Sequence, residues 1–262
     1  IKFINKVPSF GKSFICIDDK NNKDLLKKIK IKNFYTYGVN SKSQFRIKNI
    51  KQEKEFSEYD LMVNLPGKKN IVINRIKIPL LGIHNILNST AAVAVALTIG
   101  ISKNIIKNGL SEFKGVQRRF NKIFTYRETN FYDDYAHHPT EIKEVLNGVR
   151  AAYKKEEVVC VFQPHRISRL KDLKKEFSFS FKKADIVILC PVYAAGEKIK
   201  LGFNYNNFAK DIIKNSKVKL FMINNQYELA KLIKNTIYGK KIVVGMGAGT
   251  ISVWMKKLPS LI

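Results

Sequence analysis

The second half of the sequence alternates between short apolar runs and longer amphipathic stretches, and this alternation leaves few possible folds. Helical patterns fill the intervals between the apolar runs, notably over residues 167–183, 206–214 and 226–238. Alternating strands and helices are typical of a parallel sheet with helices wound over both faces. We therefore predict a mainly parallel, doubly wound α/β domain over residues 121–262. The five predicted strands are Asn130–Asp133, Val158–Phe162, Ile186–Cys190, Lys219–Ile223 and Ile242–Gly245.

Residues 1–120 carry a less regular mixture of short elements. Pro66–Asn70 separates two apolar runs, at residues 59–65 and 71–76, which predicts a β-hairpin. The small and apolar residues after His84 predict a buried helix that ends near Ile99. We expect a second, smaller α/β domain here. Its other predicted elements are strands at 13–17 and 34–37 and helices at 23–29 and 103–113.

The composition is strongly basic, with 48 basic and 21 acidic residues and a net charge of +27. A basic balance raises the possibility of nucleic-acid binding. Because the lysines are spread over almost every segment, we expect solvated faces and no nucleic-acid partner. No apolar run is long enough to cross a bilayer, and the first residues lack the pattern of a secretory signal. The absence of an initiator Met suggests a fragment or a processed chain.

The three cysteines, Cys16, Cys160 and Cys190, lie in or beside apolar runs and lack the spacing of metal ligands. Buried reduced thiols are typical of proteins in a reducing compartment. We therefore expect a cytoplasmic protein with no metal held by its cysteines.

A polar turn follows the first strand of the predicted parallel sheet. It reads Asp133-Asp134-Tyr135-Ala136-His137-His138-Pro139-Thr140-Glu141 and precedes a helical pattern that runs to about Tyr153. Ligands of open α/β sheets bind outside the carboxyl ends of the strands, which is where this turn lies. We expect Thr140 to cap the helix. The simpler alternative is a polar strand–helix turn without a ligand.

Three further turns resemble this one in position. Arg166 and Arg169 lie three apart at a predicted helix start, where their charges and the helix dipole favour an anion. Residues 191–197 follow the next strand in the same way, and residues 245–251 form a glycine-rich turn after the last strand. Arg118 and Arg119 are either a phosphate clamp or a surface pair.

A last group of polar residues opens the helix after Gly82. Asn85 and Asn88 lie three apart and share a face, and carboxamides can pair with the edge of a base. An Asn N-cap and a core His84 are the structural alternative.

Six stretches resemble the Mur ligase superfamily and occur in the family's order. They are GIHNILNSTAAVAVA, GVQRRF, DDYAHHPTEI, FQPHRISR, VYAAGE and GMGAGTIS. The resemblance covers nearly the whole chain and implies the C-terminal part of a central ATPase-type α/β domain at 1–120, then a Rossmann-like domain at 121–262. The branch it resembles most uses ATP to join L-alanine to UDP-N-acetylmuramate in peptidoglycan precursor synthesis, through an acyl phosphate.

The resemblance also implies roles for single residues. His84, Asn85 and Asn88 match the adenine side of the nucleotide site, Arg119 the arginine that reaches the ATP phosphates, and Asp134 the acid that bonds the ribose. Tyr135 is expected near the nucleotide. His137, Arg166 and Arg169 match the residues that place L-alanine, the arginines taking its carboxylate. Arg119 and His137 are the expected catalytic residues.

The family's phosphate loop, its Mg²⁺ ligands and its UDP-sugar domain have no match in this sequence. ATP and Mg²⁺ are the expected cofactors, with the metal ligands upstream of residue 1 and none among these residues. The resemblance therefore predicts that the chain is inactive alone.

Two other interpretations stay open. A related recycling ligase joins a tripeptide to UDP-N-acetylmuramate and shares a similar Asp-Asp-x-Ala-His-His-Pro turn, although Gln163-Pro164-His165 and the two arginines favour the alanine branch. A non-catalytic, basic, nucleic-acid-binding remnant is the alternative from another class, and it predicts strongly salt-dependent binding to unrelated DNA. The oligomeric state stays open.

Overall fold

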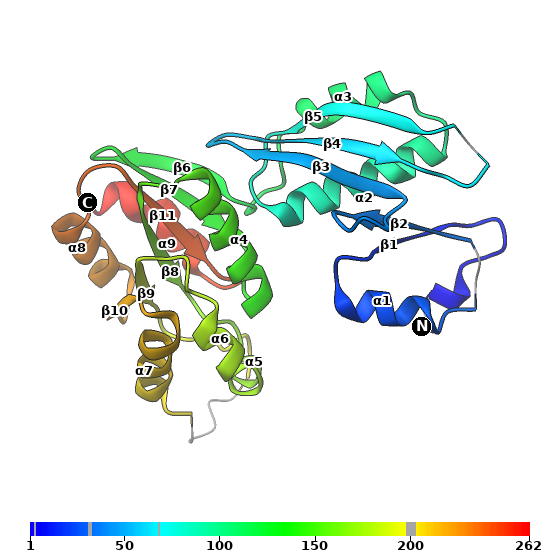
Figure 1. Ribbon diagram of the computed structural model, residues 1–262. Helices are drawn as coiled ribbons and strands as arrows, with labels where there is room; N and C mark the ends of the chain where they lie inside the picture. The colour runs from blue at the N-terminus through cyan, green and yellow to red at the C-terminus, as the bar shows by residue number, and fades with distance from the viewer. Residues whose placement is uncertain (3, 31–32, 68, 198–202) are drawn as a thin grey trace. The chain divides into compact units, whose positions relative to one another are not determined.

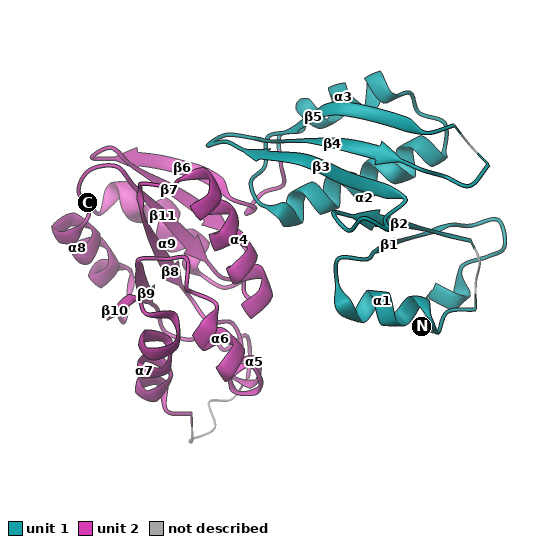
Figure 2. Cartoon of the chain, viewed as in Figure 1, with its two compact units in different colours: residues 1–114 teal, residues 115–262 magenta. Residues whose placement is uncertain are grey.

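The structure is a computed structural model that describes residues 1–2, 4–30, 33–67, 69–197 and 203–262. The chain divides into two compact units, unit 1 over residues 1–114 and unit 2 over residues 115–262 (Figure 2). Each unit has its own hydrophobic core. Asn121, where the sequence predicts a domain to begin, is the first residue of a strand in unit 2.

Unit 1 is built on a sheet of five strands in the order β1-β2-β3-β4-β5 (Figure 1). The first three strands run parallel and the last three antiparallel. The predicted hairpin is confirmed as β4 and β5. Strand β3 is missing from the prediction because its apolar alternation ends at Ile47, before a run of Lys and Asn. The strands are β1 (Ser13–Cys16), β2 (Phe34–Gly38), β3 (Phe45–Gln52), β4 (Ser57–Val63) and β5 (Ile71–Ile78).

Helix α2 (Ile83–Thr98) covers one face of this sheet. Its Ile86 and Val93 pack on the strands, and Ser89 is hydrogen-bonded to the Tyr59 hydroxyl at 2.8 Å. Val95, on its other side, is 43% exposed, so the predicted buried helix is buried along one face only. The remaining helices of unit 1 are η1 (Ile4–Lys6), α1 (Lys20–Leu26) and α3 (Lys103–Ser111).

Unit 2 contains a sheet of six strands in the order β10-β9-β8-β11-β7-β6. All neighbours are parallel except the pair β6 and β7. The predicted mainly parallel sheet is therefore confirmed, and the antiparallel edge strand β6 is an addition to it. The strands are β6 (Asn121–Tyr126), β7 (Thr129–Asp134), β8 (Glu157–Phe162), β9 (Ile186–Leu189), β10 (Lys219–Met222) and β11 (Lys241–Met246).

The helices of unit 2 lie on both faces of this sheet. Strands β7 to β10 step in one direction across the sheet, and the chain then returns to place β11 between β8 and β7. Because such crossovers are right-handed, the return puts the helix before β11 on the opposite face from the earlier helices. The helices are α4 (Pro139–Ala152), α5 (Ile167–Asp172), α6 (Lys174–Phe179), α7 (Tyr205–Ser216), α8 (Gln226–Thr236), α9 (Ile251–Lys257) and η2 (Leu258–Ser260).

Both faces of the sheet are buried. Val159, Val161 and Val243 pack with α8 and α9 on one side, and the Phe162 ring lies 5.7 Å from that of Phe177 of α6 on the other. The predicted helix at 167–183 is divided at Leu173, whose backbone angles of −114° and 23° leave the helical range. Burial on both faces explains why β8, β9 and β11 are continuous apolar runs.

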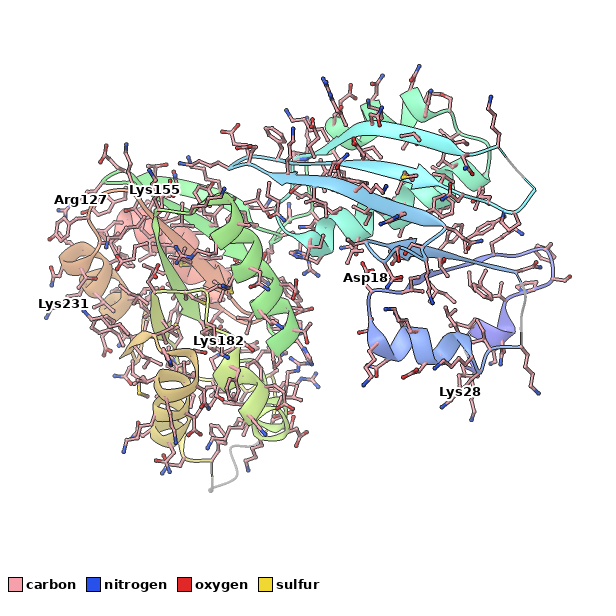
Figure 3. All side chains as sticks on the ribbon, viewed as in Figure 1. Asp18, Lys28, Arg127, Lys155, Lys182 and Lys231 are labelled. Carbon is pink, nitrogen blue, oxygen red and sulfur yellow. The ribbon has the colours of Figure 1, made fainter. Side chains whose placement is uncertain are left out.

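The positive charge is spread over different elements, as the sequence predicts. Figure 3 labels Lys28, Lys155, Lys182 and Lys231, which lie beyond α1, before β8, after α6 and on α8. Among the helices of the described residues, none is long and apolar enough to cross a membrane.

Two adjacent residues of β4 test how much the hydrophobic core contributes to the stability of unit 1. The Leu61 side chain is fully buried, whereas Met62 is only half-buried on the opposite face of the strand. We expect Leu61→Ala to lower the free energy of unfolding by about 2–5 kcal/mol, because it removes apolar contacts and leaves a cavity. Met62→Ala is the matched control and should cost less than about 1 kcal/mol. A urea titration, monitored by hydrogen exchange of the amides of unit 1, measures both free energies of unfolding. An equal loss of stability in the two variants would contradict the assignment of faces.

Candidate functional site

The carboxyl end of β7 carries two buried carboxylates. Oδ1 of Asp134 accepts the Ala136 N–H at 2.7 Å, and its Oδ2 accepts the Phe120 N–H at 2.8 Å. Oδ2 of Asp133 accepts the Ser252 hydroxyl at 2.5 Å. The two side chains thus fix the turn before β6 and the start of α9 against the end of β7.

Burial raises the pKa of Asp134 to about 6, and neighbouring Asp133 adds to the rise. The two N–H groups that Asp134 accepts, and the positive charge of Arg119, oppose this rise in pKa. Asp134 is therefore a carboxyl group whose ionised form is costly in the folded protein.

The adjacent arginines at the start of unit 2 have different surroundings. Arg118 donates from Nη2 to the Gly247 carbonyl at 2.5 Å, and its guanidinium lies 4.7 Å from the centre of the Tyr135 ring. Its Nε is 3.7 Å from Asp133 Oδ2. Arg119 is exposed, and among the described residues its side chain makes no hydrogen bond. Arg118 is thus held within the fold, and Arg119 is the one available to an anion.

Helix α4 begins at Pro139, and its N-cap is His138 rather than the predicted Thr140. His138 Nδ1 accepts the Thr140 N–H at 3.3 Å. Glu141 Oε2 accepts the N–H groups of His137 and His138, at 3.0 and 3.2 Å. Although burial opposes it, these bonds and the charge of His137 hold the pKa of Glu141 below its usual value. This reciprocal cap fixes the backbone that carries His137.

The His137 ring is oriented by a carbonyl. Its Nδ1 lies 2.9 Å from the Tyr135 carbonyl oxygen and 3.4 Å from Glu141 Oε2. Both oxygens only accept hydrogen bonds, so Nδ1 carries a proton. In the neutral ring Nε2 is then unprotonated and can accept a proton from a ligand.

Four rings form a row across the ends of three strands. We call Tyr135, His137, His165 and Tyr193 the ring row. Successive ring centres lie 5.1, 5.7 and 5.6 Å apart, and the last pair is stacked. The turns after β7, β8 and β9 thus meet at one edge of the sheet, as expected of parallel strands.

Arg166 and Arg169 lie at the start of α5, as the sequence predicts. Arg166 is exposed and is the N-cap, with a φ of 69° that non-glycine residues rarely adopt. Arg169 is half-buried and donates from Nη1 toward the Nδ1 and the carbonyl oxygen of His165, at 3.3 and 3.4 Å. Among the described residues, no hydrogen bond engages the Arg166 guanidinium or the Nε and Nη2 of Arg169. These donors can therefore bind an anion.

The turns after β8 and β9 are joined by hydrogen bonds. Arg166 N–H donates to the Tyr193 carbonyl at 2.9 Å, and Tyr193 N–H to the Pro164 carbonyl at 2.8 Å. Glu197 accepts from the backbone and hydroxyl of Ser168, at 3.0 and 2.5 Å. The sequence assigned no site role to His165, Tyr193 or Glu197; the signals were their place after predicted strands and their membership of the stretches FQPHRISR and VYAAGE.

The glycine-rich turn after β11 packs against the same turns. Buried Gln163 accepts the Ile251 N–H at 2.9 Å and donates to the Thr250 hydroxyl at 3.0 Å. A Cβ added to Gly249 would lie 2.5 Å from Gln163 Oε1 and 2.6 Å from Cγ of Tyr193. The glycine-rich turn of residues 245–251 therefore needs glycine at this position for close packing.

His84, Asn85 and Asn88 belong to unit 1 and lie at the start of α2. Asn85 donates from Nδ2 to the Leu81 carbonyl at 2.7 Å, His84 is half-buried, and Asn88 is exposed. The N-cap is Gly82, with a φ of 92°. The alternative of an Asn N-cap is therefore wrong. The carboxamide of Asn88 is more accessible than that of Asn85.

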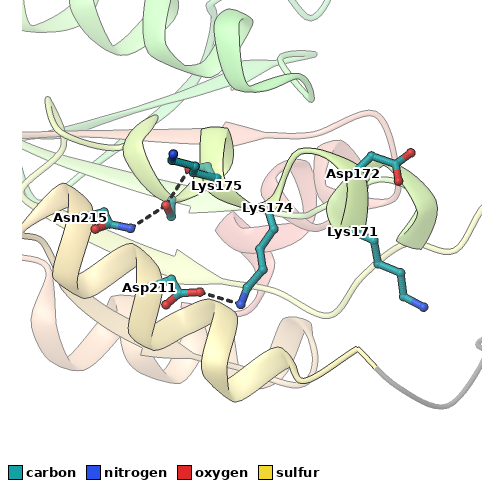
Figure 4. A pocket seen from close by; sticks show the side chains of 7 residues that line it. Lys171, Asp172, Lys174, Lys175, Asp211 and Asn215 are labelled. Carbon is teal, nitrogen blue, oxygen red and sulfur yellow. Dashed lines mark hydrogen bonds and ion pairs between the residues drawn. The ribbon is translucent and has the colours of Figure 1, made fainter.

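The described residues form no metal centre, and a hollow that they do form is lined by other side chains. Within the described ranges, no group of three or more His, Cys, Asp or Glu side chains could hold a metal ion. A hollow of about 420 Å³ lies instead between α5, α6 and α7 (Figure 4). Its lining includes the ion pair of Lys174 and Asp211, at 2.7 Å.

Buried strands that end in convergent arginine, histidine and tyrosine side chains define an α/β domain suited to an anionic ligand. The family description "Mur ligase, glutamate ligase domain" matches residues 118–249, and "Mur ligase middle domain" matches residues 1–96. The chain belongs to the Mur ligase family, in agreement with the resemblance seen in the sequence.

Its relatives include ligases of one specificity. A UDP-N-acetylmuramate--L-alanine ligase of Pelagibacter ubique is 82% identical over 262 residues, which are all of this chain and 56% of the relative. A UDP-N-acetylmuramate--L-alanine ligase of Caulobacter vibrioides is 36% identical, over 98% of this chain and 54% of the length of that relative. The chain thus spans about half the length of the curated relatives it matches.

Solved structures agree with the fold. The crystal structure of UDP-N-acetylmuramate-alanine ligase from Thermotoga maritima has a TM-score of 0.68 and 26% identity, covering 86% of this chain and 47% of that one. The crystal structure of MurF from Acinetobacter baumannii has a TM-score of 0.71 and 19% identity, and the match covers 95% of this chain and 52% of that one.

The buried Asp134 predicts an unusual pH dependence of stability. Because the folded carboxyl keeps its proton to a higher pH than the unfolded one, this stabilising protonation is complete below about pH 4 and is lost as the pH rises through about 6. The free energy of unfolding of the parent, relative to Asp134→Asn, should fall by about 2 kcal/mol between pH 4 and pH 7. Chemical denaturation at both values measures it. Asp24→Asn, at an exposed carboxylate, is the control, and a difference that stays constant with pH for Asp134→Asn would contradict the assignment.

Proposed function

We propose that this chain forms part of an ATP-dependent ligase that joins L-alanine to UDP-N-acetylmuramate. The observation that carries the proposal is the 82% identity to the Pelagibacter ubique ligase, which extends over every residue of this chain. The free guanidinium groups at the carboxyl ends of the unit 2 strands are consistent with a substrate that carries a carboxylate.

In the proposed reaction the muramyl carboxylate takes the γ-phosphoryl group of ATP and becomes an acyl phosphate. The amine of L-alanine attacks this acyl carbon, phosphate leaves, and an amide bond remains. Arg166 and Arg169 hold the alanine carboxylate, which fixes the position of the attacking amine. Nε2 of neutral His137 is the acceptor for the proton that the amine must lose.

The nucleotide roles in the proposal rest on the resemblance of single residues to the family. Asn88, His84 and Asn85 take the adenine, Arg119 takes the phosphates, and Asp134 takes the ribose with Tyr135 beside it. Asn85 keeps its carboxamide oxygen for this purpose, since its Nδ2 already donates to Leu81. Each Asp134 oxygen accepts one backbone N–H and has a second lone pair for a hydroxyl.

We assign no metal ligand to this chain. Among the described residues no group of three or more His, Cys, Asp or Glu side chains could hold a metal ion. Mg²⁺ remains part of the proposed reaction as a cofactor of the whole ligase, and no step here passes through it.

The proposal is tested with a hybrid in which this chain replaces the matching 56% of the Pelagibacter ubique ligase. We expect phosphate release from ATP that requires both UDP-N-acetylmuramate and L-alanine. Release that requires a tripeptide in place of alanine would favour the recycling reaction and overturn the proposal. Tight, salt-sensitive binding of unrelated DNA without any ligation would favour the nucleic-acid alternative.

The carboxylate clamp has its own test in the same hybrid. Arg166→Ala or Arg169→Ala should lower kcat/KM for L-alanine by about 30-fold to several thousand-fold, because each leaves a bound carboxylate short of a charged partner. Arg→Lys changes should also weaken the reaction, since lysine lacks the planar fork. Lys171→Ala, at an exposed position of α5, is the matched control. Unchanged alanine dependence in both Arg→Ala variants would remove the clamp.

A further inference from the structure

The Arg169 guanidinium contacts a nitrogen of a neighbouring imidazole. Its Nη1 lies 3.3 Å from His165 Nδ1 and 3.4 Å from the carbonyl oxygen of the same residue. A guanidinium keeps all its protons in a protein and only donates. Nδ1 of His165 must therefore accept, which requires it to be unprotonated, so the proton of the neutral ring is on Nε2.

The orientation of this ring is set by its neighbours from two other turns. The Tyr193 ring is stacked on it at 5.6 Å, and the His137 ring meets it edge-on at 5.7 Å. Backbone bonds between the turns after β8 and β9 hold His165 and Tyr193 in register. The imidazole therefore cannot turn away from Arg169 without disturbing the ring row.

We propose that His165 is a positioning residue, whose neutral ring accepts from Arg169 through Nδ1 and holds the guanidinium ready for the carboxylate of the incoming amino acid. One Nη1 proton is engaged by His165, and the donors on Nε and Nη2 remain for the ligand. A half-buried arginine held in this way loses less side-chain entropy when the ligand binds. The two imidazoles of the ring row thus have opposite tautomers, His137 protonated on Nδ1 and His165 on Nε2.

Burial favours the neutral form of His165 by lowering its pKa. Positive charge on Arg169, Arg166 and a protonated His137 lowers this pKa further, and Glu197 opposes the change. Tyr193 adds an uncharged ring. Protonation of His165 would both remove the acceptor and place a second positive charge beside Arg169.

The tautomer can be measured directly on this chain, without catalysis. Long-range ¹H–¹⁵N correlation of the imidazole groups at pH 7 should give His165 the pattern of an unprotonated Nδ1 and a protonated Nε2. The four histidines make assignment practical, with His165→Asn as the reference spectrum. A proton on Nδ1 of His165 would overturn the proposal, whether or not the chain belongs to an alanine ligase.

The positioning role rests on the proposed function and is tested in the hybrid ligase. His165→Asn keeps an acceptor near the position of Nδ1 but loses the ring, whereas His165→Phe keeps a ring to stack on Tyr193 but has no acceptor. We expect the Asn variant to keep KM for L-alanine within about threefold and the Phe variant to raise it about tenfold or more, the effect of one lost hydrogen bond near a charged group. KM for ATP should stay constant in both, because the contact lies on the amino-acid side.

The outcomes separate the two proposals. If the unsubstituted hybrid does not ligate alanine, the proposed function fails while the tautomer measurement still tests the contact. If the hybrid is active and His165→Phe keeps the parental KM for alanine while His165→Asn raises it, ring packing is what matters and the positioning role is overturned. Equal effects of both variants on alanine and ATP would also overturn it, since they indicate a general structural loss.

Discussion

The buried carboxylate of Asp134 connects the segments on which the site of unit 2 depends. It accepts one N–H from the turn before β6 and one from the turn after β7, so the exposed Arg119 and the ring of His137 are carried on backbone held by the same side chain. A buried charge is costly unless it is hydrogen-bonded. The raised pKa of Asp134 indicates that the two bonds and the nearby arginine offset only part of that cost.

The cationic groups at this edge of the sheet divide into two kinds. Arg118 is tied to the Gly247 carbonyl and lies over the Tyr135 ring, which joins the first turn of unit 2 to the last. Arg166 and Arg119 are exposed, and Arg169 is engaged at one nitrogen only. The fold thus uses one arginine as internal support and leaves three to face an anion. Gln163 and the close-packed Gly249 hold the intervening turns together in the same way.

Sequence reasoning was strongest where a residue pattern has one structural meaning. Strands β8, β9 and β11 could be predicted because burial on both faces requires continuous apolar runs. Strands β3 and β6 could not, because neither keeps a strict apolar alternation. Polar residues follow Ile47 in β3, and in β6 Ile123 and Phe124 are adjacent at a register shift. The division of the helix at Leu173 could not be predicted from the sequence either, because no Gly or Pro lies there.

The sequence by itself determined that strands and helices alternate, that polar turns follow the strands, and that the chain resembles one ligase family. These properties depend on local patterns of residue type, which a single chain displays directly. The tertiary structure alone decided which of two adjacent arginines is internal, that His138 and not Thr140 caps α4, and that His165 lies between His137, Tyr193 and Arg169. Such choices depend on distances and hydrogen-bond directions in the folded chain, which distinguish groups that are equivalent in sequence.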